Sequence, residues 1–386
     1  MDFTLNKEQL AVKEKAAAFA KKYVEPVAAE LDEKAEFPME NFKRMGEEGI
    51  LGLPVPEEYG GGGIDTVSYV ALIEEVAKID ASTAVIIASN ASLVSNPILY
   101  FGTDEQKNKY LPDLASGKKL GSFCLTEPEA GTDSSRQKAT AVDKGDHWLI
   151  NAHKKFITNG GIAETYVVFA MTDASKGYGG ISAFIVEGSM EGVSQGKIEK
   201  KMGIRASRTC EMHFDNVKVP KENLLGKVGQ GFDIAMATLD SGRIGIAAQA
   251  LGIAQGAYDM TISYMQEREQ FGVKLGQLDT LRFEVASFKV KLDSARLLTY
   301  RAASCKDEGL PYKEEAAIAK LAASEAAVDI TRMAIQLHGG YGYMSDLPLE
   351  RMYRDAKITE IYEGTSQVQQ MVIAACEFAV RTSVKK

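Results

Sequence analysis

Residues 166–186 read YVVFAMTDASKGYGGISAFIV, and the division of the chain follows from this stretch. Two short runs rich in β-branched and aromatic residues, 166–171 and 181–186, flank a turn that contains three glycines. Such runs predict strands, and the alternation of apolar and polar residues over 210–214 (CEMHF) predicts another. The close spacing of strands and glycine turns favours a small antiparallel sheet or barrel over alternating βαβ units.

On both sides of this region, apolar residues recur at steps of three and four, which is the period of an amphipathic helix. In the first third these positions are Ala16, Phe19, Ala20, Tyr23 and Val27, then Tyr69, Leu72, Ile73, Val76 and Ile79. Residues 54–63 are predicted to form a loop, because prolines and a glycine run break helices. The helical period returns after Pro220 and continues through Lys386. The sequence therefore predicts a mainly α chain with a helical domain at 1–120, a β-domain at 121–226 and a helical domain at 227–386.

Composition is that of an ordinary soluble globular protein, with 386 residues, 45% hydrophobic and 25% charged. The net charge of −8 arises from interleaved acidic and basic residues, which disfavours binding to nucleic acid or to acidic membranes. The N-terminus lacks a signal or transit pattern and no apolar run of 18 residues follows, so we expect a cytoplasmic protein. Four widely spaced cysteines, Cys124, Cys210, Cys305 and Cys376, are expected to be buried thiols.

Several common catalytic motifs are missing, namely GxSxG, GxxxxGK[ST] and HExxH. The four histidines, His147, His153, His213 and His338, lack metal-ligand spacing along the chain, so no metal site is predicted. The glycines of residues 338–343 follow a helical stretch, which argues against a GxGxxG dinucleotide fold.

Residues 361–369, IYEGTSQVQ, place Glu363 on a glycine-containing turn before the last helix, which Ser366 and Gln369 are predicted to start as a capping box. Partial burial there would raise the carboxyl pKa toward about 6–7 and make Glu363 a general base. A solvated glutamate stabilised by the helix dipole is the alternative.

Two basic residues are further candidates. Arg243 lies three residues after Asp240, so the two side chains share a helix face, either as an exposed ion pair or as a ligand-binding pair. Arg268 could pair with a pyrophosphate, because arginine forms bidentate bonds to phosphate oxygens, or it could lie in solvent.

Together these stretches resemble the acyl-CoA dehydrogenase family, most closely its short-chain, butyryl-CoA dehydrogenase-like bacterial members. The resemblance covers essentially the whole chain and rests on seven motifs in the family's order, residues 125–133, 156–160, 201–205, 239–243, 268–272, 336–340 and 361–365. It implies a helical N-terminal domain, a middle antiparallel β-domain and a C-terminal four-helix bundle. It also implies an FAD between the β-domain and the bundle, whose adenosine part reaches a neighbouring subunit of a homotetramer, a dimer of dimers.

The resemblance assigns roles to individual residues. The residues expected around the isoalloxazine ring are Leu125, Thr126, Phe156, Ile157 and Thr158. The residues expected to contact the pyrophosphate and adenosine are Arg268, Phe271, Gln336, Gly339, Gly340, Thr365 and Gln367. The residues expected to contact the acyl-CoA are Thr132, Asp240, Arg243 and Gly364. Asp279 replaces a usual glutamine and is not counted as a flavin ligand. Arg136 replaces a common glycine and either binds phosphate near the CoA entrance or lies in solvent.

The implied reaction is α,β-dehydrogenation of an acyl-CoA thioester to the trans-2-enoyl-CoA, or the reverse reduction. Glu363 removes the α-proton, the Cβ hydride moves to flavin N5, and electrons pass to an electron-transfer flavoprotein. Some relatives carry the base at the position of Gly242, which has no carboxylate here. An acyl-CoA oxidase is an alternative that the chain length disfavours. A non-catalytic flavin-binding or acyl-CoA-binding scaffold is another, disfavoured by retention of Glu363 and Arg243. The acyl group stays open, with short linear chains favoured.

Overall fold

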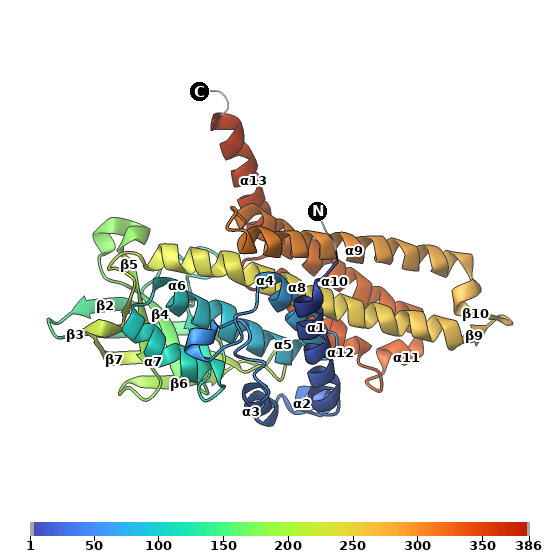
Figure 1. Cartoon of the computed structure of the whole chain (residues 1–386), viewed down its shortest axis with the longest axis horizontal. Coiled ribbons are helices and arrows are strands. Elements are labelled where there is room, and N and C mark those ends of the chain that lie inside the picture. The colour runs from blue at the N-terminus through green and yellow to red at the C-terminus, as the bar shows by residue number, and fades with distance from the viewer. Residues whose placement is uncertain (1–3, 384–386) are drawn as a thin grey trace.

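The computed structural model describes residues 4–383, and along the sequence two helical parts flank a β-sheet, which lies at one end of the molecule (Figure 1). The N-terminal part contains α1 (Lys7–Phe19), α2 (Ala28–Lys34), α3 (Met39–Glu47), α4 (Thr66–Ala77), α5 (Ala81–Ala88), α6 (Asn96–Phe101) and α7 (Asp104–Ala115), with π-helical turns η1 (Ala20–Val24) and η3 (Ser89–Ser95). Ala16, Phe19 and Ala20 are buried, as their spacing predicts. Residues 54–63 form the predicted loop, apart from the 3-10 turn η2 (Glu57–Tyr59).

The continuous helical stretch Ala81–Phe101 has the length and apolarity of a membrane span, a feature that the sequence pattern did not predict. Of its most apolar window, 78% is buried inside the protein. A core helix of a globular protein passes the same length and composition test, so this stretch is weak evidence for a membrane span.

The central sheet has eight strands, in the order β6-β7-β3-β2-β4-β5-β8, with β1 paired to β4 outside this path. The strands are β1 (Gly121–Cys124), β2 (Thr140–Asp143), β3 (His147–Thr158), β4 (Thr165–Met171), β5 (Ile181–Glu187), β6 (Val193–Ile198), β7 (Thr209–Pro220) and β8 (Leu224–Leu225). The predicted strands at 166–171, 181–186 and 210–214 are confirmed. Most neighbours are antiparallel, but β4 pairs in parallel with β1 and β2, which differs from a purely antiparallel sheet.

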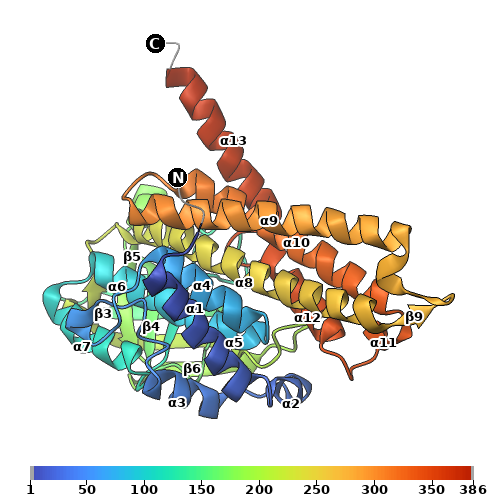
Figure 2. The same ribbon diagram turned by 45° about the vertical axis from the view of Figure 1, so that its right-hand side comes forward.

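The C-terminal part is built on three long helices that run side by side (Figure 2). Its elements are α8 (Gly231–Glu267), the hairpin β9 (Glu269–Gln270) and β10 (Val273–Lys274), α9 (Asp279–Asp307), α10 (Lys313–His338), α11 (Gly340–Tyr343), α12 (Leu349–Ala356) and α13 (Ser366–Ser383). Short 3-10 turns are η4 (Ala174–Gly180), η5 (Lys221–Asn223), η6 (Leu275–Gln277) and η7 (Lys357–Glu360). The end of α13 projects from the body in both views, and the last three residues of the predicted helical region lie outside the described residues (Figures 1 and 2). The helical, β, helical order is confirmed.

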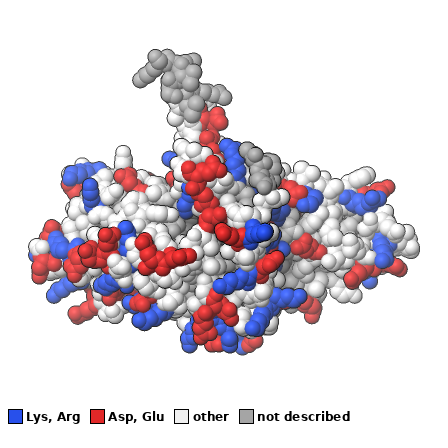
Figure 3. Space-filling model, in the orientation of Figure 1, with Lys and Arg blue, Asp and Glu red and all other residues white. Residues whose placement is uncertain are grey.

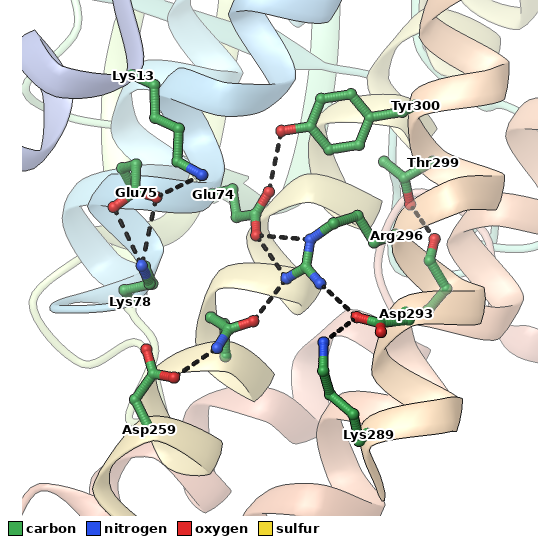
Figure 4. Close-up of polar contacts among 12 residues, drawn as sticks. Lys13, Glu74, Glu75, Lys78, Asp259, Lys289, Asp293, Arg296, Thr299 and Tyr300 are labelled. Carbon is green, nitrogen blue, oxygen red and sulfur yellow. Dashed lines mark hydrogen bonds and ion pairs between the residues drawn. The ribbon is translucent and has the colours of Figure 1, made fainter. Parts of the chain in front are cut away.

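A buried ionic network joins the N-terminal helices to the C-terminal bundle (Figure 4). Glu74 of α4 is 2% exposed, and its carboxylate accepts hydrogen bonds from Arg296 Nη2 at 2.8 Å and from Tyr300 Oη at 3.1 Å. Both partners lie on α9, and Arg296 also donates to Gln255 of α8 at 2.7 Å. The network therefore fixes α4 against α9 and against α8, the helix that carries the candidate site residues Asp240 and Arg243.

At the surface, acidic and basic side chains lie next to one another over the face shown in Figure 3. Among the cysteines, Cys124 and Cys210 are buried as expected, whereas Cys305 and Cys376 are half-buried, because they lie on the more exposed helices α9 and α13. All four are free thiols.

Candidate active site

Glu363 lies on the loop just before α13, and its carboxylate contacts α8 at Gly242, in the first third of that helix. Its side chain is half-buried, and Oε2 is shielded from solvent without a hydrogen-bond partner among the described residues. Burial raises the pKa of Glu363 to about 7, although the nearby cations of Arg243 and Lys320 oppose the shift. The backbone has φ = 52°, a left-handed conformation that is uncommon for a glutamate. These features favour the predicted general base over the solvated alternative.

Gly242 makes the space for this carboxylate. A Cβ built on Gly242 would overlap Glu363 Oε2 and would lie 3.2 Å from Leu93 Cδ2. One turn further along α8, a Cβ on Gly245 would lie 2.5 Å from the hydroxyl of Tyr69. That hydroxyl is also buried and unpartnered within the described chain. Glycines on one face of α8 therefore leave room for two unpaired polar groups.

Hydrogen bonds to Gly364 hold the loop that carries the base. Lys320 Nζ donates to the Gly364 carbonyl at 2.7 Å, and Gln369 Nε2 donates to the same oxygen at 2.8 Å. The predicted capping box is wrong by one residue: α13 begins at Ser366, and the cap is Thr365, whose Oγ1 accepts from the Val368 amide at 3.3 Å. Gln369 bonds to the loop carbonyls instead, because they point back over the first helical turn.

Asp240 and Arg243 form the predicted pair on α8, but the pair is not an exposed one. Arg243 is 4% exposed, and its Nη1 lies 2.5 Å from Asp240 Oδ1. Arg243 Nε is buried without a partner in the described structure. Arg243 is also close enough to Glu363 for its positive charge to lower the pKa of that carboxyl, so the guanidinium lies near the carboxylates of both Asp240 and Glu363. A buried guanidinium with a spare donor fits ligand binding better than surface pairing.

The residues expected around the isoalloxazine come from two adjacent segments. The backbone amide of Lys155 donates to the Thr126 carbonyl at 2.9 Å, which joins the segment after β1 to the end of β3. Phe156 has φ = 57° and is 59% exposed. The hydroxyls of Thr126 and Thr158 make no hydrogen bond to the described residues. An exposed aromatic ring beside two free hydroxyls suits a planar cofactor with a polar edge.

Lys154 supports these segments, a role that the sequence pattern did not reveal. Its side chain is fully buried in the β-domain, and Nζ donates to the Leu125 carbonyl at 3.1 Å, to Glu127 at 2.8 Å and to Gln137 at 3.0 Å. Burial lowers the pKa of Lys154, while Glu127 opposes that shift. In sequence, Lys154 lies between His153 and Lys155, and no pattern distinguishes it from these polar neighbours.

A second group of predicted cofactor residues lines a cavity of about 540 Å³ beyond the other end of α8. Its walls include Arg268, Gln336, Gly339 and Gly340. A Cβ on either glycine would meet no atom within 4 Å, and Gly339 has φ = 60°. The Arg268 guanidinium has no acidic partner within the described chain and lies 5.8 Å from the ring of Tyr341. Open glycine backbone and a free guanidinium fit a pyrophosphate and adenosine.

The two halves of the predicted FAD site do not meet within one chain. The β-domain and the hairpin β9–β10 lie at opposite ends of the molecule in Figure 1. They are separated along α8, whose 37 residues span about 55 Å at ~1.5 Å per residue. A larger cavity of about 1090 Å³, near α1, α2 and α12, includes none of the predicted site residues.

The remaining candidates lie at the surface. Thr132 and Arg136 are exposed on the turns between β1 and β2, Phe271 is 94% exposed at the tip of the hairpin, and Gln367 is exposed at the start of α13. Asp279 pairs with Arg282 at 3.2 Å in the first turn of α9, away from the β-domain.

Two histidines that are far apart in sequence lie together on the sheet. His153 of β3 and His213 of β7 are register partners, and Glu211 lies on the same face. The spacing of the histidines along the chain did not predict this proximity, because strand pairing between β3 and β7 brings His153 and His213 together.

Comparison with known proteins identifies the family. Three family descriptions match: "Acyl-CoA dehydrogenase, N-terminal domain" over residues 6–118, the middle domain over 122–217 and the C-terminal domain over 229–377. A short-chain specific acyl-CoA dehydrogenase of Clostridium acetobutylicum is 54% identical over 97% of this chain and 99% of its own length.

Two solved structures are similar over nearly the whole chain. The butyryl-CoA dehydrogenase of Megasphaera elsdenii is 47% identical with a TM-score of 0.96, and the match covers 98% of this chain and 100% of that one. A chain in a structure described as "Electron transferring flavoprotein of Acidaminococcus fermentans: Towards a mechanism of flavin-based electron bifurcation" is 52% identical with a TM-score of 0.96, covering 97% and 99%. This chain therefore belongs to the acyl-CoA dehydrogenase family of FAD-dependent oxidoreductases.

Proposed function

We propose that this enzyme removes hydrogen from Cα and Cβ of short-chain acyl-CoA thioesters, with Glu363 as the α-proton base. The main observation in support is that Glu363 Oε2 is buried and has no hydrogen-bond partner among the described residues. Burial also raises the pKa of this carboxyl to about 7. A base of this pKa is half deprotonated near neutral pH and can hold the proton it removes. When bound, FAD would supply the hydride acceptor.

The surroundings of Glu363 support a base that is positioned rather than mobile. Lys320 and Gln369 hold the Gly364 carbonyl, and Gln369 Nε2 also donates to the Glu363 carbonyl at 3.3 Å, so the two peptides that follow the base are held. The backbone amide of Glu363 itself would stabilise negative charge on the thioester carbonyl oxygen as the proton leaves. Arg243, which is buried with a spare donor, would contact the substrate from α8 together with Asp240.

A short acyl chain is supported by what surrounds the carboxylate. Leu93 approaches α8 at Gly242 and Tyr69 approaches it at Gly245. We infer that these two side chains would limit the length of an acyl chain that reaches past Glu363. Tyr69 is 7% exposed, so the region near its hydroxyl is closed to solvent.

The test is an anaerobic titration of the purified yellow protein with saturated acyl-CoAs of increasing length, followed by flavin absorbance. We expect rapid bleaching by short chains, lost in Glu363→Gln while FAD stays bound. Glu360→Gln is the matched control, because Glu360 lies three residues earlier and pairs with Lys357. No bleaching by any thioester, or bleaching by Glu363→Gln at the wild-type rate, would overturn the proposal.

We also propose a homotetramer in which FAD bridges two chains. The support is the separation of the two predicted FAD half-sites and the exposed apolar side chains of Phe283, Val290 and Leu297, seven residues apart on α9. Val290→Asp is expected to reduce both molecular mass by light scattering and FAD content, whereas Val142→Asp on the β-domain surface should change neither. Full FAD content in a monomeric variant would contradict a bridging cofactor.

Electron transfer to an electron-transfer flavoprotein in the cytoplasm is the remaining part of the proposal. The 52% identical chain occurs in a structure described by that partner's name. The substrate-reduced enzyme should be reoxidised rapidly by an electron-transfer flavoprotein and slowly by dioxygen. Rapid peroxide formation would instead indicate an oxidase, and anaerobic turnover only from the enoyl-CoA would indicate a reductase.

A further inference from the structure

The outer face of strands β3 and β7 carries two imidazoles and a carboxylate in contact. His153 and His213 are directly opposite each other, and their rings stack with centroids 4.5 Å apart and an interplanar angle of 20°. Glu211 precedes His213 by two residues, so its side chain is on the same face. His153 Nε2 lies 3.5 Å from Glu211 Oε2. The edge strand β6 and the body of the sheet hold both strands in place (Figure 1).

The spacing of these groups suits a metal ion. One ligand atom from each residue lies within 4.8 Å of the others. Imidazole nitrogens and carboxylate oxygens bind Zn²⁺ at about 2.0–2.2 Å, so ligand atoms on one ion are separated by a few ångströms. Two histidines with one glutamate form a ligand set that zinc uses in proteins.

The neighbouring strand leaves room at the histidine. Residue 196 of β6 is a glycine and has no side chain. A Cβ at this position would lie 2.6 Å from His213 Nε2. A larger residue at 196 would cover that nitrogen. Lys155 Nζ lies 3.4 Å from Glu211 Oε1 and is the competing cation that a metal would have to displace from this carboxylate.

We propose that His153, Glu211 and His213 form a binding site for a zinc-class divalent transition metal on the surface of the β-domain, with water completing the coordination. The site is separate from Glu363 and does not depend on the proposed dehydrogenation. Because its ligands come from two strands, bound metal would cross-link β3 to β7 close to Phe156. Metal that binds only the folded protein also raises thermal stability.

The experiment is a Zn²⁺ titration of the tag-free, chelator-treated holoenzyme by calorimetry, with Co²⁺ absorption as a second readout of the ligand set. We expect one saturable Zn²⁺ per chain and a rise in Tm with Zn²⁺. His153→Ala should weaken binding at least ~10-fold, since removing even the outer partners of a metal site costs about 10–100-fold. His147→Ala is the control, because His147 begins the same strand but contacts Asp146 instead.

Glu211→Gln and His213→Ala should weaken Zn²⁺ binding as His153→Ala does. The His153 side chain is 45% exposed, so its removal should leave the Tm in chelator nearly unchanged and separate metal loss from misfolding. The proposal fails if the wild type shows no saturable binding, if His153→Ala binds Zn²⁺ as tightly as the wild type, or if His147→Ala weakens binding equally.

Discussion

The carboxylate of Glu363 occupies the space that a side chain on Gly242 would need, so two residues 121 positions apart share one small volume. Gly242 lies inside α8, where glycine costs about 1 kcal/mol relative to alanine. The close contact gives a reason for a glycine at this unfavourable position. It also explains how a base supplied by the loop before α13 can approach the face of α8.

Gly242→Ala is expected to displace the base. The added methyl would push Glu363 from its position, and a shift of about 1 Å can cost about 100-fold in rate. The rate of flavin reduction by a short acyl-CoA should fall at least ~10-fold while FAD content is retained. Gly179→Ala is the control, since a Cβ there meets no atom within 4 Å. A wild-type rate in Gly242→Ala would show that Glu363 is not the reacting group.

The pH dependence of the reaction should report the raised pKa of Glu363. The base acts only when deprotonated, so kcat/KM should fall as the pH drops below about 7. Lys320 lowers this pKa, and Lys320→Met should therefore move the acid limb to higher pH. Lys357→Met, which alters a surface lysine paired with Glu360, should leave the limb in place. An acid limb in the wild type near pH 4.5 would assign the base elsewhere.

Loss of the carboxylate of Glu74 should loosen the N-terminal helices from the bundle. Glu74→Ala leaves the partly buried Arg296 without its main anion, and breaking such a pair costs about 3–5 kcal/mol. Urea unfolding should show this loss, whereas Lys34→Ala, which breaks an exposed and solvent-screened pair with Glu30, should leave the stability nearly unchanged. A change in Glu74→Ala no larger than in Lys34→Ala would mean that the network in Figure 4 adds little.

The order of helical and β parts could be predicted because each element carries its period locally. Residues 166–171 and 181–186 are strands, and the apolar steps at Ala16 to Ala20 mark a buried helix face. Strand pairing is not local, which is why the parallel contacts of β4 with β1 and β2 were missed. The same limit hid the meeting of His153 with His213.

The candidate base could be placed on its loop from sequence, but its environment could not. The contact with Gly242 depends on how α13 approaches α8. The helix cap is Thr365 and not the predicted Ser366, because the backbone φ values near Gly364 set the residue at which α13 starts. Lys154 was missed for a related reason: a lysine in a strand reads as a surface residue unless its buried partners are known.

Lys154→Met should weaken FAD binding by disturbing the segment after β1. The substitution removes the hydrogen bond to the Leu125 carbonyl and leaves Glu127 buried without its cation, although two backbone amides, of Lys138 and Ala139, still donate to it. We expect a loss of stability and at least ~10-fold weaker FAD binding, measured by urea unfolding and by fluorescence of released flavin. Lys138→Met is the control, because Lys138 pairs with the exposed Glu129.

The double variant Lys154→Met/Glu127→Gln separates the two effects. With both charges removed, no buried anion is left unpaired, so stability should largely recover. The hydrogen bond to Leu125 stays missing, so FAD binding should stay weak. Recovery of FAD binding together with stability would show that Lys154 acts only by neutralising Glu127 and does not position the flavin segment.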